Sequence, residues 1–156
     1  MPQTKFQKLF FMLMTVMLSV TSFVIYNIAI SRGGMSNEVF ILALKQIPIE
    51  FAVAFPIQLL LGYRLSKRLA FRAVNPEKDK PITVILAITC GTICIMCPSM
   101  SFAATIIHDG INSEFAANFL QKMVYNFPFA FFTQIFIIGP TVRMIFRNTL
   151  GRKSAA

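Results

Sequence analysis

Three cysteines come closest to a chemical motif in this sequence. Cys90, Cys94 and Cys97 are separated by four and three residues, which places all three thiols on one face of a helix. Soft sulfur ligands at this spacing suit copper(I) or zinc, and Cys94 to Cys97 matches the C-x-x-C of redox proteins. A four-helix disulfide oxidase would need a second cysteine pair, and the chain has only three cysteines. Small side chains on one helix face also suit close helix packing, so we expect packing rather than a metal or redox site.

Other catalytic patterns are weaker. The single histidine, His108, excludes a two-histidine metal site within the chain, and Gly33-Gly34 lacks the spacing and lysine of a phosphate-binding loop. No Ser-His-acid set or pair of carboxylates falls on one side of the apolar segments described next. We therefore expect no cofactor, no resident metal and no enzymatic activity.

The composition is that of a membrane protein. Of 156 residues, 56% are hydrophobic, and the mean hydropathy of +0.67 is far above that of a soluble domain. The formal net charge of +9 is not interleaved with stacking aromatics, so nucleic acid is not expected as a partner. Four apolar segments are long enough to cross a bilayer: Leu9 to Ile30, Ile47 to Tyr63, Ile82 to Ile107 and Met123 to Val142.

An internal repeat pairs these segments. A shift of 76 residues superimposes Gly34, Glu38, Leu44, Phe51, Ala54, Phe55 and Gln58 on Gly110, Glu114, Leu120, Phe127, Ala130, Phe131 and Gln134. The sequence thus predicts an all-α membrane protein with four transmembrane helices, arranged as two tandem helical hairpins of parallel orientation. The predicted organisation is one four-helix domain, 1–156: repeat one 1–72, linker 73–80, repeat two 81–148 and a basic tail 149–156. The simplest packing places the second and fourth helices together, with the first and third facing lipid or a second protomer.

Basic residues set the expected orientation. Lysines and arginines gather before the first span, between the second and third, and after the fourth, whereas the outer turns hold only Arg32 and His108. By the positive-inside rule, both termini and the middle loop are cytoplasmic.

Polar residues within the second and fourth spans are the candidate solute or ion site. They are Lys45, Gln46, Glu50, Gln58, Lys122, Asn126 and Gln134. Glu50 and Lys122 are expected to approach one another at the outer end of a polar cleft, because a buried carboxylate is costly without a partner. Two interpretations stay open: a site that attracts a cation or proton, and a structural ion pair that fixes helix register. Gln58 and Gln134 are expected to act mainly through interhelical hydrogen bonds.

A basic cluster follows the second span. Arg64, Lys67, Arg68 and Arg72 recur every three to four residues and so share one helical surface. Such a surface favours anionic lipid head groups.

Short motifs resemble one bacterial family. Ala54-Phe55-Pro56, then Arg64-Leu65-Ser66-Lys67-Arg68, and Gly139-Pro140-Thr141-Val142-Arg143 at the end of the fourth helix are similar to the pattern of domain of unknown function 2798. That family is built of two-helix units, often in tandem. The resemblance implies the cytoplasmic (inner) membrane of a bacterium as the location and brings no activity with it.

Two classes of function remain. The first is a small conduit or transporter for an ion or polar solute that works as a homo-oligomer. The second is an accessory protein that docks a membrane-protein partner or anionic lipid. Glu50 and Lys122 favour the first, because docking does not require charged groups within the spans.

Overall fold

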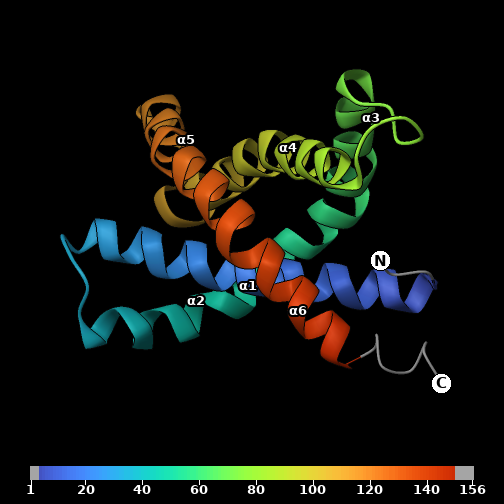
Figure 1. Ribbon diagram of the computed structural model, residues 1–156. Coiled ribbons are helices and arrows are strands. Elements are labelled where there is room, and N and C mark those ends of the chain that lie inside the picture. The colour runs from blue at the N-terminus through green and yellow to red at the C-terminus, as the bar shows by residue number, and fades with distance from the viewer. Residues whose placement is uncertain (1–3, 150–156) are drawn as a thin grey trace. The chain divides into compact units, whose positions relative to one another are not determined.

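The computed structural model describes residues 4–149, and its regular elements over that range are all helical (Figure 1). In chain order they are α1 (Lys5–Ser31), α2 (Asn37–Ile57), the π-helical segment η1 (Gln58–Gly62), α3 (Tyr63–Ala73), α4 (Pro81–Asp109), α5 (Phe115–Phe132), the π-helical segment η2 (Thr133–Ile138) and α6 (Gly139–Thr149). The predicted basic tail, including Arg152 and Lys153, lies outside the described residues except for Thr149.

Four continuous helical stretches are long and apolar enough to cross a membrane: Lys5–Ser31, Asn37–Ala73, Pro81–Asp109 and Phe115–Thr149. They confirm the four predicted spans and the all-α class. At 1.5 Å per residue, even the 27-residue first helix is about 40 Å long, more than the ~30 Å hydrocarbon core.

Local signals explain where the helices begin and end. At the start of α1, Thr4 Oγ1 accepts a hydrogen bond from the Gln7 amide at 3.2 Å, and the Gln7 side chain accepts one from the Thr4 amide at 3.4 Å. The outer turns reverse at Gly33 and Gly110, whose φ angles of 75° and 70° favour glycine. The predicted reversal points are thus the positions where the backbone requires glycine.

The chain folds as two compact units: residues up to Phe51 together with those from Thr133 onward, and Ala52–Phe132. In the first unit, α1 packs against η2 and α6. Its buried stripe is Val16, Val20, Val24 and Ile28. Phe11 and Phe146 meet edge to face with ring centroids 5.7 Å apart, and Ser19 Oγ donates a hydrogen bond to Gln134 Oε1 at 3.1 Å. These contacts hold α1 to the end of the fourth helical stretch.

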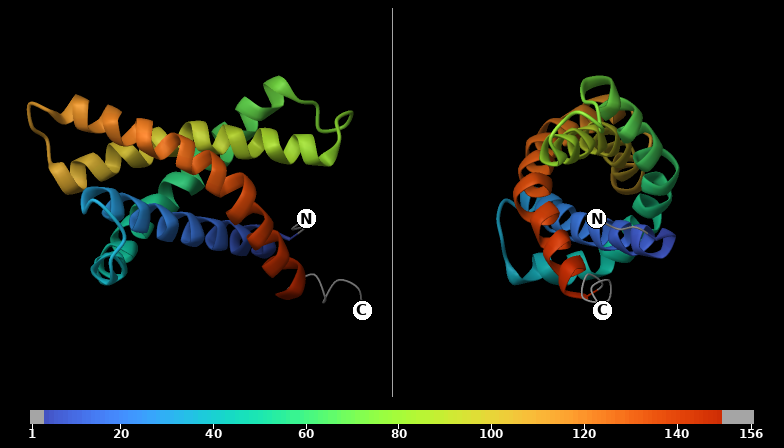
Figure 2. Two further views of the ribbon diagram at one scale, coloured as in Figure 1. Left: turned by 60° about the vertical axis from the view of Figure 1, so that its left-hand side comes forward. Right: turned by 45° about the vertical axis from the view of Figure 1, so that its right-hand side comes forward.

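In the second unit, α4 is the central helix. It packs against α3 and η1, and it runs back from the turn at Gly110 alongside α5 (Figure 2). Gly91 marks the closest approach to α3, because a Cβ there would lie 2.7 Å from the backbone oxygen of Ser66. The third span, α4, therefore has helix neighbours along both halves, and the prediction that its remaining surface faces lipid or a second protomer stays a prediction. Close packing of small residues draws these helices together, since lipid is as apolar as the side chains it replaces.

In each repeat, the C-terminal part of the second helix packs against the first helix of the other repeat. In the first unit, α1 of repeat one packs on η2 and α6 of repeat two. In the second unit, α4 of repeat two packs on η1 and α3 of repeat one. The tandem hairpins predicted from the sequence are present, but the close helix contacts join partners from different repeats.

The two π-helical segments occupy equivalent positions in the repeats. With the 76-residue offset, Gln58–Gly62 falls on residues 134–138, within Thr133–Ile138. A carbonyl at the end of each segment receives a side-chain donor from four residues on: Ser66 Oγ donates to Gly62 O, and Arg143 Nε donates to Gly139 O at 3.0 Å. Each of these side chains thus gives a hydrogen bond to a carbonyl at, or directly after, the last residue of a π-helical segment.

Candidate polar site on the α4–α5 hairpin

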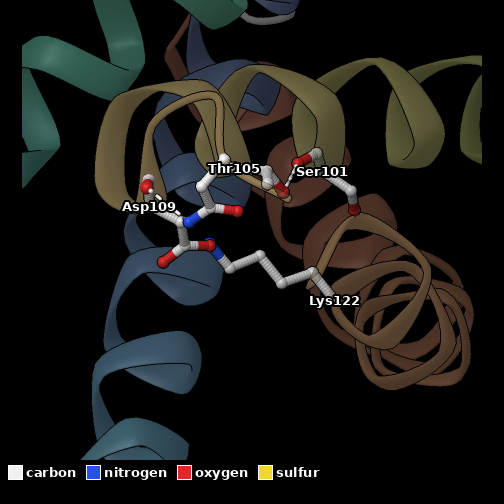
Figure 3. Close-up of polar contacts among 5 residues, drawn as sticks. Ser101, Thr105, Asp109 and Lys122 are labelled. Carbon is white, nitrogen blue, oxygen red and sulfur yellow. Dashed lines mark hydrogen bonds and ion pairs between the residues drawn. The ribbon is translucent and has the colours of Figure 1, made fainter. Parts of the chain in front are cut away.

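Polar and small side chains follow one another along the buried face of α4. Cys97, Ser101, Thr105 and Asp109 are spaced four residues apart, which keeps them on nearly the same face. Ser101 is 1% exposed and Thr105 is fully buried. The Thr105 hydroxyl donates to the Ser101 carbonyl oxygen at 2.7 Å, so the hydroxyl oxygen of Thr105 is left as an acceptor (Figure 3).

The outer end of this stripe is an ion pair. Lys122 Nζ on α5 donates to Asp109 Oδ2 at 2.6 Å, and the two side chains are 25% and 31% exposed (Figure 3). Asp109 is the last residue of α4, where the negative end of the helix dipole disfavours a carboxylate. The Lys122 ammonium offsets the negative charge of the Asp109 carboxylate and the negative end of the α4 dipole. Lys122 was predicted to approach Glu50, which belongs to the other compact unit, so that approach stays a prediction; the ion pair described here joins Lys122 to Asp109.

Side-chain direction explains the Asp109–Lys122 ion pair. Side chains on a helix lean toward its N-terminus, so Lys122 extends back toward the turn and the end of α4 rather than deeper into α5. Asn112 lies in the same turn, and its Nδ2 donates to the Asp109 carbonyl oxygen at 3.3 Å.

Asn126 lies one helical turn beyond Lys122. On the facing helix, Phe102 of α4 meets Phe115 and Phe119 edge to face, with ring centroids 5.4 and 6.0 Å apart, so the first turns of α5 lie beside this part of α4. Asn126 is 5% exposed and Ala130 is also buried. We call Ser101, Thr105, Asp109, Lys122 and Asn126 the polar stripe.

One atom of the polar stripe, Asn126 Oδ1, is buried without a hydrogen-bond partner among residues 4–149, whereas Ser101 Oγ has the Cys97 thiol as a hydrogen-bonding neighbour. A buried polar group that has lost water without gaining a partner costs about 1–3 kcal/mol. Buried polar groups of this kind are usually satisfied by an ordered water or an ion.

The other predicted site residues are placed elsewhere. Glu50 is buried on α2 at 8% exposure, where it has an interaction within the structure; Lys45 is exposed and Gln46 half-buried on the same helix. These three belong to the first unit. Lys122 and Asn126 are the predicted site residues that the structure gathers on one hairpin.

The two glutamines lie in the π-helical segments. Gln134 accepts its hydrogen bond from Ser19 on α1, an interhelical bond of the kind expected. Gln58 is half-buried, and its side chain occupies the place where a Cβ at Gly62 would stand.

The cysteines differ in exposure. Cys97 is buried in the stripe of α4, Cys90 is partly exposed and Cys94 is exposed. Over the described part of the chain, no group of three His, Cys, Asp or Glu side chains could hold a metal ion.

The basic cluster lies on α3. Ser66 and Ala70 are the buried side of this helix, so Arg64, Arg68 and Arg72 remain exposed while Lys67 is partly covered. Lys67 Nζ donates to the Tyr63 hydroxyl at 2.9 Å and lies 4.2 Å from the centroid of that ring.

Sequence reasoning missed Thr105 and Asp109 as site residues. The available signal was the four-residue spacing that continues from Cys97 through Ser101, together with a polar residue every four positions on α5. The predicted site was based on polar residues of the second and fourth spans, and so it did not include this pattern on the third.

Four helices that can each cross a membrane, with polar side chains buried along one hairpin, define the class: an all-helical protein compatible with a multi-pass membrane location. The chain belongs to the family described as domain of unknown function (DUF2798), which matches residues 4–74 and 83–150. It is 32% identical over 161 residues to an uncharacterized protein, YybC, of Bacillus subtilis (strain 168), covering 100% of this chain and 99% of that relative. No solved structure matches the chain.

Proposed function

We propose that the protein is a membrane conduit for a small ion or polar solute, with the polar stripe of α4 and α5 as part of its path. The observation that supports this most is the buried amide oxygen of Asn126, which lies within a span and has no hydrogen-bond partner among the described residues. The stripe runs inward from the Asp109–Lys122 ion pair, which gives it a partly exposed entrance. Polar groups held at this cost inside a span are typical of solute pathways.

We propose that the conduit is a homo-oligomer in the cytoplasmic membrane of a bacterium, with both termini in the cytoplasm. Two helices cannot enclose a path by themselves, so further helices are needed around it. Large apolar side chains on α5, such as Val124 and Phe132, are 64% and 67% exposed and so are available for contact with another copy. A second copy of the chain offers apolar surface of the same kind.

Flux through liposomes tests the conduit. The purified protein is reconstituted, and fluxes of monovalent cations, anions, protons and small neutral solutes are compared with those of protein-free vesicles. Asn126→Leu should abolish any protein-dependent flux. The control is Gln121→Leu, which makes the equivalent change at an exposed position of the same helix. No protein-dependent flux of any solute would contradict the proposal, as would a flux that Asn126→Leu leaves intact.

The alternative function is docking of anionic lipid or of a membrane-protein partner. The exposed basic side of α3 supports it, because Arg64, Arg68 and Arg72 face away from the α4 contact. Each basic side chain near an anionic leaflet contributes about 1 kcal/mol. Replacing these arginines and Lys67 with Gln should weaken retention of anionic lipid on the purified protein, as measured by mass spectrometry of bound lipid. Unchanged retention would remove this alternative.

A further inference from the structure

The connection that joins α3 to α4 (Figure 1) borders an open pocket of about 520 Å³. A pocket of this volume is large enough for a small ligand. Residues 71–76 and Asp79 line it, and two of these side chains carry opposite charges, Arg72 and Asp79. A ligand that complements this pair has both an anionic and a cationic group.

Hydrogen bonds centred on Asn75 fix the loop and the Asp79 carboxylate. The Asn75 amide donates to Asp79 Oδ2 at 2.6 Å, and Asn75 Oδ1 accepts from the Glu77 amide at 3.0 Å. The Asn75 carbonyl oxygen accepts from the amides of Lys78 and Asp79 at 3.2 and 2.9 Å. A carboxylate accepts several hydrogen bonds, so Asp79 can still accept one from an ammonium group. Because Asp79 is already held in place, binding costs little further ordering of its side chain.

Arg72 supplies the positive charge of the pocket. It has no hydrogen-bond or ion-pair partner in the part of the chain that the structure describes, residues 4–149. Its planar guanidinium presents five N–H donors in a geometry that matches the oxygens of a phosphate. The other charged side chains of the loop, Glu77, Lys78 and Lys80, do not line the pocket. A phosphate beside Arg72 and an ammonium beside Asp79 are therefore the complementary groups.

The pocket lies at the level of lipid head groups. The apolar segment of α4 at residues 82–107 is about 39 Å long at 1.5 Å per residue, close to the ~40–45 Å thickness of a bilayer with its head groups. Each end of this segment therefore reaches a head-group layer, and Asp79 precedes Ile82 by three residues. Phe71, which also lines the pocket, is 45% exposed and offers apolar contact to the rest of a lipid.

We propose that this pocket binds the zwitterionic head group of a phospholipid, with the phosphate on Arg72 and a primary ammonium on Asp79. Phosphoethanolamine is a head group with this pair of charges. Phosphocholine has the same charges, but its quaternary ammonium has no N–H to donate to the carboxylate, and phosphoglycerol has no cation. The site differs from the basic surface at Arg64 and Arg68, since α3 includes no carboxylate.

Native mass spectrometry of the full chain in detergent tests the site. Phospholipids with identical acyl chains and phosphoethanolamine, phosphocholine or phosphoglycerol head groups are titrated in turn. Asp79→Asn should weaken phosphoethanolamine binding roughly twofold to fivefold, the range for one exposed ion pair, without weakening phosphoglycerol binding. The loop should keep its fold, because Asn Oδ1 can still accept from the Asn75 amide. Arg72→Gln should weaken binding of all three lipids. The matched control is Glu77→Gln, which removes a loop carboxylate that does not line the pocket and should leave all three unchanged.

Three results would overturn the proposal. The first is an equal loss of phosphoethanolamine binding in Asp79→Asn and Glu77→Gln, which would reduce the effect to the general charge of the loop. The second is unchanged lipid binding in Arg72→Gln. The third comes from glycerophosphoethanolamine, the same head group without acyl chains: if it displaces the lipid at equal concentration, the pocket recognises a soluble phosphorylated amine and the lipid is not its ligand. Neither Arg72 nor Asp79 belongs to the polar stripe, so these outcomes are independent of the conduit.

Discussion

Lys122 Nζ and Asp109 Oδ2 are 2.6 Å apart, so one ion pair ties the first turns of α5 to the last turn of α4. The link closes a hairpin whose two arms are 13 residues apart at this point. It also places both charged side chains at the entrance of the polar stripe.

Loss of this ion pair should cost little stability. Both side chains are partly exposed, and pairs of this kind contribute roughly 0.2–1 kcal/mol. Lys122→Met and Asp109→Asn should therefore each lower the free energy of unfolding by less than about 1 kcal/mol. Thermal unfolding in detergent, followed by circular dichroism, measures the change. A loss of several kcal/mol would show that the pair is buried more deeply than this structure places it.

Gly91→Ala should be far more damaging. The new methyl group would meet the Ser66 carbonyl oxygen at 2.7 Å, and a backbone atom cannot rotate away. Overpacking of this kind costs about 1–3 kcal/mol, measured by the same unfolding experiment. Cys94→Met enlarges an exposed position three residues farther along α4 and is the matched control. Equal melting temperatures for the two variants would contradict the close approach of α3 and α4.

Ser19 and Gln134 should show coupling in a double-mutant cycle. Their 3.1 Å hydrogen bond joins α1 to η2, and such bonds contribute about 0.6 kcal/mol on average in membranes. Ser19→Ala, Gln134→Leu and the double variant supply the cycle. Pairing Gln134→Leu with Thr21→Val, whose hydroxyl bonds within α1, supplies an uncoupled control. Strict additivity of the Ser19 and Gln134 changes would argue that α1 does not pack on η2.

Orientation can be checked by cysteine labelling in intact cells. In a background without the three natural cysteines, we expect Ser36→Cys in an outer turn to react with an impermeant thiol reagent and Asn75→Cys in the middle loop to stay protected. The distribution of lysine and arginine is the physical reason. The opposite labelling pattern would reverse the predicted topology.

The sequence predicted the elements better than their partners. Apolar length defines a span, and Gly33 and Gly110 define reversals, because both are local properties. The Asp109–Lys122 pair was not predicted, because it depends on side-chain direction, which the repeat offset does not report. The π-helical segments were missed too, since a single extra residue in a turn leaves the apolar pattern almost unchanged.

The pairing of helices was the least predictable feature. Hydropathy shows that α1 and α4 are apolar on all sides and so does not select the neighbour of either. Gly91 gave a hint of close packing, but only the structure identifies Ser66 as its neighbour. In the sequence, Ser101 and Thr105 resemble ordinary small residues of a packed helix, and only the structure shows that both are buried.

The exchange of helix ends between repeats bears on the ancestry and assembly of this architecture. An isolated hairpin holding α1 and the second helix of its own repeat would lack the η2 and α6 surface that α1 uses here. In a dimer of such hairpins, the end of the second helix of each copy would pack on the first helix of the other copy, as in a domain-swapped dimer. Duplication and fusion of a gene for a single hairpin would then preserve an existing dimer within one polypeptide, and the connection at residues 73–80 would be a late addition. Separately expressed halves of this chain should consequently find each other in the membrane.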